Sequence, residues 1–154
     1  MWMQQVSAEM TRINFSLARA YLGTNQTGVA SVVYTKVLLG TENYDIGNNF
    51  SSYKYVCPVT GYYSVKASVY MVTVTGAVLS GLASIRKNGV DAAQGTYVAS
   101  ANGNTLIASV SSDLYCLAGE YLELFGYAAT TGATTFSFGA GSDLTFMSVH
   151  LIST

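Results

Sequence analysis

Residues able to act as general acids, bases or nucleophiles are few in this chain of 154 residues, and their spacing matches no catalytic motif. His150 is the only histidine, and no serine lies in the Gly-x-Ser-x-Gly turn that presents the nucleophile of many hydrolases. Glu120 and Glu123 are three residues apart on an expected strand, so they point to opposite faces and cannot be the carboxylate pair of a glycosidase. We therefore expect that the protein is not an enzyme, and a small hydrolase is the least favoured alternative.

The possible metal ligands are equally sparse. Cys57 and Cys116 are the only cysteines and form no Cys-x-x-Cys pair, so we expect two free, buried thiols, with a disulfide as the alternative. Glu42 and Asp45 flank an asparagine-rich loop whose oxygens could bind calcium, but the loop lacks the ligand spacing of a known calcium loop. We expect no cofactor, and calcium binding near Glu42 and Asp45 is left open.

The composition favours a surface that is covered by partners. Charged residues make up 10% of the chain, whereas about 25% is typical of soluble proteins, and hydrophobic residues make up 50%. Such a surface favours an assembly, and the alternative is a very stable monomer with a Ser/Thr surface. The net charge is −1 and the basic residues are scattered, so we expect no nucleic-acid partner.

One uncharged run, Ala67–Ile85, is long enough to span a bilayer by length alone. Serine, threonine and glycine interrupt this run at the spacing of strands and turns, which is not the pattern of a membrane helix. We therefore expect no membrane insertion.

Alternation with a period of two is clearest between Tyr62 and Met71, where the odd-numbered residues form one largely apolar face. Turn signals separate about nine or ten such strands, with no convincing interior helix, so we expect an all-β antiparallel two-sheet jelly-roll sandwich. Phe50–Val59 and Tyr62–Val74 are expected to form a hairpin-like pair around Pro58–Gly61. Asn88-Gly89 predicts a tight hairpin turn.

The first residues of the chain differ from the rest. Their apolar side chains include spacings near one helical turn: Trp2, Met3, Val6, Met10 and Ile13. This segment is expected to be a short helix, an extended arm that packs on a neighbour, or a disordered end. We therefore divide the chain into an N-terminal arm, residues 1–14, and a single jelly-roll domain, residues 15–154.

Several motifs resemble those of a known family. Asp45 is followed five residues later by Phe50, and Tyr55 precedes the segment Cys57–Tyr63. Two further marks are the Lys-Asn-Gly turn that ends at Gly89 and the segment Leu117–Leu124. Together they resemble the trimeric jelly roll of the complement first-component q-subunit heads and the tumour-necrosis-factor superfamily, over about Phe15 to Ile152.

The chain departs from that family at some positions. The spacing between Phe50 and Tyr55 is two residues shorter than usual, Val65 and Ala67 stand where aromatic residues are usual, and Ser148 replaces a usual glycine. No collagen-like repeat precedes the domain. These departures weaken a link to complement-type ligand recognition more than they weaken the fold.

Two other segments are similar to the openings of stand-alone heads among the structural proteins of tailed bacteriophages. The first is Ala20-Tyr21-Leu22 followed by Asn25-Gln26-Thr27, and the second is Tyr34-Thr35-Lys36-Val37. The resemblance implies a virion location, a homotrimer, and contacts with other capsid or tail proteins.

The family resemblance also implies where the subunits meet, because one face of the last strand would line the threefold axis. We expect the trimer contact to include Tyr62, Phe146, His150 and Ile152. Three copies of His150 would then lie close together and repel one another when protonated at mildly acidic pH. The expected core includes the following residues: Tyr63, Val65, Ala67, Val69, Met147, Val149 and Leu151.

The expected function is that of a virion structural protein. The favoured hypothesis is a trimeric capsid decoration protein, with residues 1–14 as the anchoring arm. The alternative is the receptor- or carbohydrate-binding head of a tail fibre, with the loops Ala101–Asn104 and Thr130–Gly141 as its contact surface. Tyrosine suits both a subunit interface and a sugar-binding surface, and for Tyr62 and Tyr70 we favour the interface.

Overall fold

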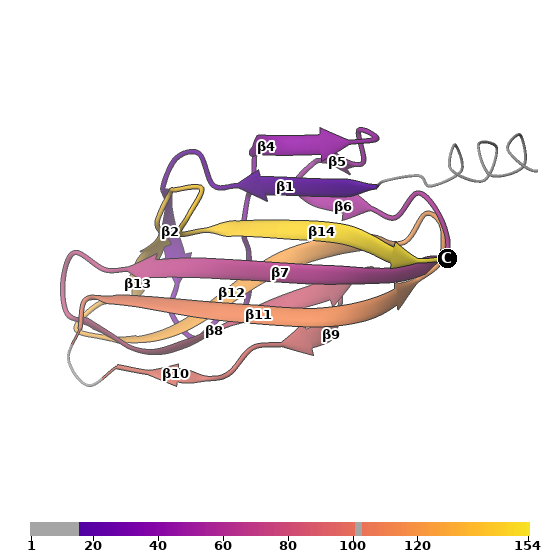
Figure 1. Ribbon diagram of the computed structural model, residues 1–154. Helices are drawn as coiled ribbons and strands as arrows, with labels where there is room; N and C mark the ends of the chain where they lie inside the picture. The colour runs from indigo at the N-terminus through magenta and orange to yellow at the C-terminus, as the bar shows by residue number, and fades with distance from the viewer. Residues whose placement is uncertain (1–15, 101–102) are drawn as a thin grey trace, which may run out of the picture.

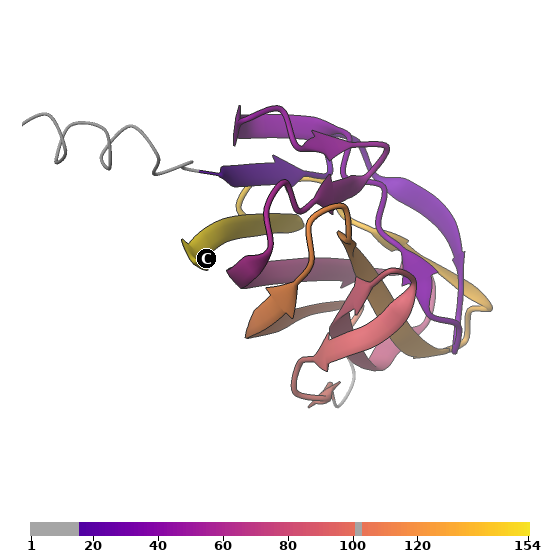
Figure 2. The same cartoon turned by 90° about the vertical axis from the view of Figure 1, so that its right-hand side faces the viewer.

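The computed structural model describes residues 16–100 and 103–154, and within them the regular elements are all strands, packed as two antiparallel sheets (Figures 1 and 2). The β7 sheet contains β1 (Leu17–Tyr21), β2 (Gln26–Ala30), β4 (Thr41–Ile46), β7 (Gly61–Val72), β11 (Thr105–Cys116), β13 (Thr135–Phe138) and β14 (Phe146–Ser153). The β12 sheet contains β3 (Thr35–Lys36), β5 (Phe50–Ser51), β6 (Lys54–Val56), β8 (Ala77–Lys87), β9 (Val90–Gln94), β10 (Val98–Ala99) and β12 (Tyr121–Thr131). This confirms the predicted all-β sandwich.

In the β7 sheet, β7 lies at the centre. One of its edges pairs with β11 over the whole length of both strands, from Val72 opposite Thr105 to Gly61 opposite Cys116. Its other edge pairs with β14 and, at its end, with β13. The order β4, β1, β14, β7, β11 is seen in Figure 1, from the indigo and purple strands to the orange one.

The core lies between the two sheets and has the composition expected from the alternation. Tyr63, Val65 and Val69 are completely buried. The other predicted members are also covered: Ala67, Met147 and Val149 are buried, and Leu151 is half-buried against the core. The predicted core is therefore confirmed.

The two sheets are closely packed where β12 crosses the β7 sheet. A Cβ atom on Gly126 would lie 2.6 Å from the ring of Phe138 and 3.2 Å from a methyl group of Val69. Phe138 is completely buried, so its ring occupies the space that any larger residue at position 126 would need. A glycine is required here for steric reasons.

The predicted pairing of Phe50–Val59 with Tyr62–Val74 is wrong. β6 pairs with β5 and β12, whereas β7 belongs to the other sheet, so Cys57–Thr60 is a crossing between layers. Alternation identifies the buried face of a strand but not its hydrogen-bonded neighbour, and here Tyr55 and Tyr63 meet across the core with ring centroids 6.0 Å apart. The chain before the crossing also turns back on itself, at Ser52 and Tyr53, where φ is 51° and 62°.

Of the other expected loops and turns, the tight turn is confirmed, and two polar segments contain strands. Asn88 and Gly89 have φ of 52° and 80° and join β8 to β9, which confirms the tight turn. The polar segment that follows Thr41 forms the edge strand β4, and part of Thr130–Gly141 forms β13. Both are strands with few buried residues or short length, so hydrophobic alternation did not reveal them.

The uncharged run Ala67–Ile85 consists of the second half of β7, a turn and most of β8. No helix in residues 16–100 or 103–154 is long and apolar enough to cross a membrane.

Candidate functional site: the open face of the β7 sheet

The β7 sheet buries one face and leaves the other, here called the open face, uncovered within the subunit. Its outward positions follow from the register: Leu17, His150, Ser64 and Asp113 form one row across β1, β14, β7 and β11. Five large apolar or aromatic side chains on this face are about half exposed: Ile46 (52%), Tyr62 (52%), Ile107 (49%), Tyr115 (49%) and Ile152 (55%). Several half-exposed apolar and aromatic side chains on one face of a chain with few charges are typical of a protein–protein interface.

Tyr62 and Tyr115 form the aromatic centre of one end of the open face. They are directly opposite each other in the β7–β11 ladder, and their ring centroids are 5.2 Å apart. Ile152 lies on the adjacent strand near Tyr62, where a bulge follows Leu151. Both tyrosines remain about half exposed beside each other, so about half of their area is free for a partner.

Phe146 is at the other end of the open face and is partly covered within the subunit. The guanidinium of Arg19 lies 3.8 Å from the centroid of its ring. Arg19 is itself held in place, because it donates to the Asn43 side chain at 3.2 Å and to the Ser142 carbonyl at 2.5 Å. Phe146 thus offers less free area than Tyr62 or Ile152.

His150 is exposed between these two ends, and its Nε2 atom lies 3.2 Å from the Tyr44 hydroxyl. Ser64 lies opposite His150, and Asp113 lies opposite Ser64 on its far side. The carboxylate that would orient the imidazole in a hydrolase is therefore two strands away from His150. The row does not have the geometry of a Ser-His-Asp triad.

All four residues of the predicted trimer contact, Tyr62, Phe146, His150 and Ile152, lie on this one face. The sequence analysis missed Ile46, Ile107 and Tyr115, which extend the face onto β4 and β11. The alternation within Thr105–Cys116 contained the signal for Ile107 and Tyr115, because buried and exposed residues alternate over most of that strand.

Two of the acidic residues stabilise turns by accepting hydrogen bonds from backbone N–H groups. The carboxylate of Asp45 accepts hydrogen bonds from the backbone N–H groups of Asn49 at 3.0 Å and Phe50 at 2.8 Å, which explains the spacing between Asp45 and Phe50. Glu120 accepts from the backbone N–H of Leu117 at 2.8 Å, and this bond holds the pKa of Glu120 below its ordinary value. Within the described parts of the chain, no three His, Cys, Asp or Glu side chains come together as a metal site.

The two thiols lie on the two connections that cross between the sheets at the same end of the sandwich. Cys57 and Cys116 are both free and completely buried, as predicted. The crossings are joined by backbone hydrogen bonds of 2.8 Å from Cys57 to Glu120 and from Gly119 to Cys57. A hydrogen bond with the Cys116 thiol, together with burial, raises the pKa of Cys57, so neither geometry nor charge marks it as a nucleophile.

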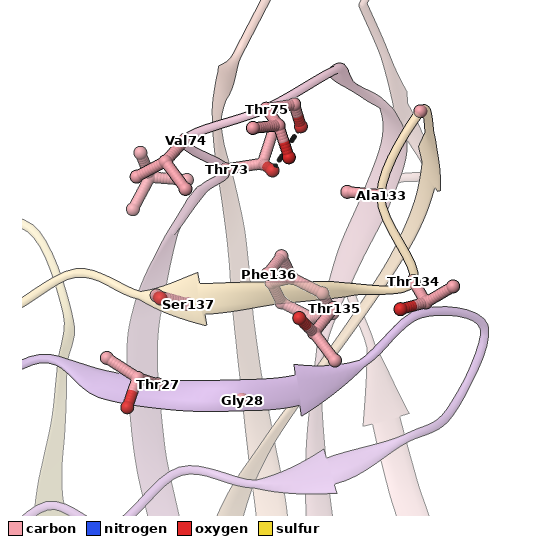
Figure 3. Close-up of a pocket in the computed structure, with 12 residues that line it drawn as sticks. Thr27, Gly28, Thr73, Val74, Thr75, Ala133, Thr134, Thr135, Phe136 and Ser137 are labelled. Atoms are coloured by element: carbon pink, nitrogen blue, oxygen red, sulfur yellow. Dashed lines mark hydrogen bonds between the residues drawn. The ribbon is translucent and has the colours of Figure 1, made fainter.

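A groove of about 800 Å³ lies between the β2–β13 pair and the loop Thr73–Thr75 (Figure 3). It is at the opposite end of the sandwich from Cys57 and Cys116. Its walls are rich in threonine and carry no charged side chain, and the Thr73 hydroxyl donates to the Thr75 carbonyl at 2.6 Å. The Thr73 N–H donates to the Asn104 carbonyl at 2.9 Å. Of the two loops predicted as a contact surface, Thr130–Gly141 therefore lines the groove, and Asn104 of the other is bonded to a residue that lines it.

The proposed anchoring residues Trp2, Met3, Val6, Met10 and Ile13 lie outside the described residues. The described chain begins at Ser16, just before β1, where the Ser16 hydroxyl forms a hydrogen bond with the buried Tyr55 hydroxyl.

Comparison with solved structures assigns the class of fold. The globular domain of zebrafish complement 1qA protein matches with a TM-score of 0.55 and 12% identity, covering 89% of this chain and 97% of that one. Eiger TNF from S. frugiperda matches with a TM-score of 0.66 and 10% identity, covering 90% and 93%. Murine APRIL matches with a TM-score of 0.62 and 11% identity, covering 90% and 99%.

The fold is therefore the jelly roll shared by the complement 1q heads and the tumour-necrosis-factor proteins, which confirms the resemblance of the motifs. At these identities the likeness establishes the fold. No protein-family model matches the sequence, and no curated protein is significantly similar to it.

Proposed function

We propose that this chain is a non-enzymatic virion structural protein that assembles as a homotrimer and decorates the surface of a bacteriophage capsid. The observation that carries the proposal is the open face of the β7 sheet, where five half-exposed apolar or aromatic side chains gather on one side of the subunit.

The open face carries charged residues as well, among them Arg19, Lys66 and Asp113, and Arg19 is compatible with burial. Arg19 is already held by Asn43 and Ser142 and lies against Phe146, so burying it would leave none of those contacts broken. A subunit contact centred on Tyr62 and Ile152 would cover aromatic and aliphatic area, which is the composition typical of interface centres. The fold class and the family motifs support three copies as the number in the assembly.

The virion assignment is supported by the similarity of two sequence segments, Ala20–Thr27 and Tyr34–Val37, to the openings of phage heads. Residues 1–14, with their apolar side chains, are the proposed means of attachment. Decoration therefore separates into two parts: assembly by the jelly roll and anchoring by the arm.

Deletion of residues 1–14 tests this division. We expect the shortened chain to remain a trimer while losing co-sedimentation with capsids that lack the protein. Val90→Asp, on β9 of the other sheet and 69% exposed, is the matched control and should bind capsids as the unmodified chain does. Capsid binding that survives the deletion would contradict anchoring by the arm, and failure of the full chain to bind capsids would contradict decoration.

The second candidate function is the receptor- or carbohydrate-binding head of a phage tail fibre. The observation in its favour is the uncharged groove, which one of the two predicted contact loops, Thr130–Gly141, lines (Figure 3). In this case the deleted chain would remain on the particle, and cell adhesion would be the activity that is lost.

A further inference from the structure

A row of tyrosines crosses the outer face of the β12 sheet, far from the open face in the sandwich because the two sheets lie back to back. Tyr127 lies between two others: its ring centroid is 5.0 Å from that of Tyr34 and 6.4 Å from that of Tyr97. Tyr97 is 54% exposed, and Tyr34 and Tyr127 are half-buried. The interplanar angles are 38° and 42°, so neither pair is packed edge-on.

Polar groups flank the row at both ends. At one end the guanidinium of Arg86 lies 5.7 Å from the centroid of Tyr34 and 4.1 Å from that of Phe125, and donates to Asp91 at 2.8 Å. At the other end the hydroxyls of Tyr97 and Ser80 are hydrogen-bonded at 2.7 Å. Hydrogen-bonding groups therefore lie at both ends of a row of three rings.

Two pairs of opposite charge beside the row are satisfied within the subunit. Arg86 pairs with Asp91, and beside them Lys36 pairs with Glu123 at 2.6 Å. Neither pair offers a charged ligand an unpaired group of opposite charge. A neutral ligand could accept a hydrogen bond from Arg86 and donate one to Asp91 without breaking the pair. The balance of charge therefore favours a neutral, hydroxyl-rich ligand over an acidic or basic one.

The segment that carries Tyr34 adds exposed apolar surface beside the row. Val32 has φ of 58°, a conformation that is strained for a β-branched residue, and its side chain is 63% exposed. Hydrogen bonds hold this turn against β12: Val32 donates to the Ala128 carbonyl at 2.8 Å, and the Ser31 hydroxyl accepts from Thr130 at 3.0 Å. The backbone thus fixes Tyr34 beside Tyr127 before any ligand arrives, which lowers the ordering cost of binding.

We propose that the strip formed by Tyr34, Tyr97, Tyr127, Arg86 and Asp91 binds a neutral oligosaccharide, with sugar rings stacked on the tyrosines and their hydroxyls bonded to the Arg86–Asp91 pair. The separations of the tyrosine rings are close to the length of one hexopyranose unit, so neighbouring sugars of a linear chain can meet neighbouring rings. The inference deepens the second proposed function, the carbohydrate-binding head, and moves its contact surface away from the groove. In the groove the aromatic residue Phe136 is only 3% exposed and offers no ring face.

Isothermal titration of the full chain tests the proposal, with linear neutral hexasaccharides of β-1,4-glucose, α-1,4-glucose and β-1,4-N-acetylglucosamine, and oligogalacturonate as the acidic comparison. We expect at least one neutral probe to bind, no binding of oligogalacturonate, and about tenfold weaker binding by Tyr97→Ala, which corresponds to about 1.4 kcal/mol. Tyr53→Ala is the matched control, because Tyr53 is 42% exposed on the same sheet but outside the strip, and its affinity should equal that of the unmodified chain.

Three results would overturn the proposal: no neutral probe binds at millimolar concentration, Tyr97→Ala binds as the unmodified chain does, or only the acidic probe binds. Thr134→Ala, which changes a residue of the groove, provides a second check. If this variant lost sugar binding while Tyr97→Ala bound normally, the sugar would lie in the groove instead. The native mass is measured on the same samples. An intact trimer without sugar binding would reject this inference while leaving the assembly proposal standing.

Discussion

Replacing Tyr62 with aspartate is the sharpest perturbation of the open face. Tyr62 is 52% exposed and its main ring contact is with Tyr115, so Tyr62→Asp should fold with a loss of about 1 kcal/mol or less. The effect on assembly should be much larger, because the same side chain would be covered in all three subunits.

The size of that effect follows from the exposed area. Half of a tyrosine side chain that buries about 150–250 Å² leaves roughly 75–125 Å² for a neighbour to cover. At about 25 cal/mol per Å², this is roughly 2–3 kcal/mol for each subunit and roughly 6–9 kcal/mol for the trimer. A loss of about 6 kcal/mol changes the dissociation constant by roughly four decades, and because the midpoint concentration varies as its square root, the midpoint should rise about 100-fold.

Sedimentation equilibrium over a wide range of concentration measures this midpoint directly. Val90→Asp introduces the same charge at an exposed apolar position of the other sheet and should leave the midpoint unchanged. The reasoning is refuted if Tyr62→Asp dissociates at the same concentration as the unmodified chain, or if Val90→Asp dissociates equally.

Three further predictions concern the fold. Asp45→Ala removes two hydrogen bonds from backbone N–H groups, one of them from Phe50, and should cost about 1.5–3 kcal/mol in chemical denaturation; added calcium should leave the melting temperature of the unmodified chain unchanged, and a clear rise would reopen the calcium hypothesis. Gly126→Ala places a methyl group against the ring of Phe138 and should lower the unfolding free energy by about 1–3 kcal/mol, whereas equal stability would mean that this part of the core is loose. Burial raises the pKa of Tyr63 from 10.0 to about 12, so between these pH values the unfolded chain has lost a proton that the folded chain keeps, and the unfolding free energy should fall as pH rises. Tyr63→Phe should make that fall shallower, and an unchanged slope would contradict the assignment to Tyr63.

The long strands were predictable because their periodicity persists over many residues. In β7 the residues from Tyr62 to Met71 alternate almost without interruption, so both the strand and its buried face followed from the sequence. The same holds for the core residues of β14, where Met147 and Val149 face inward.

The pairing of strands was not predictable in the same way. Tyr55 and Tyr63 would be buried both in a hairpin and in two facing sheets, and only the tertiary packing decides between these arrangements. The edge strand β4 also escaped prediction, since most of its residues are polar and none of them is fully buried.

The same distinction applies to the surface sites: the face of a strand could be predicted, whereas contacts between distant segments could not. Tyr62 and Ile152 could be placed on one face by counting along strands and by family resemblance. The row formed by Tyr34, Tyr97 and Tyr127 could not, because a turn, a connecting segment and a strand that are distant in the sequence bring these side chains together.

The native mass of the unmodified chain tests the central claim most directly. In native mass spectrometry at neutral pH, the protein should have three times the subunit mass of 16.3 kDa. A species with the mass of one or two subunits, at concentrations where the purified protein is soluble and folded, would contradict assembly through the open face of the β7 sheet.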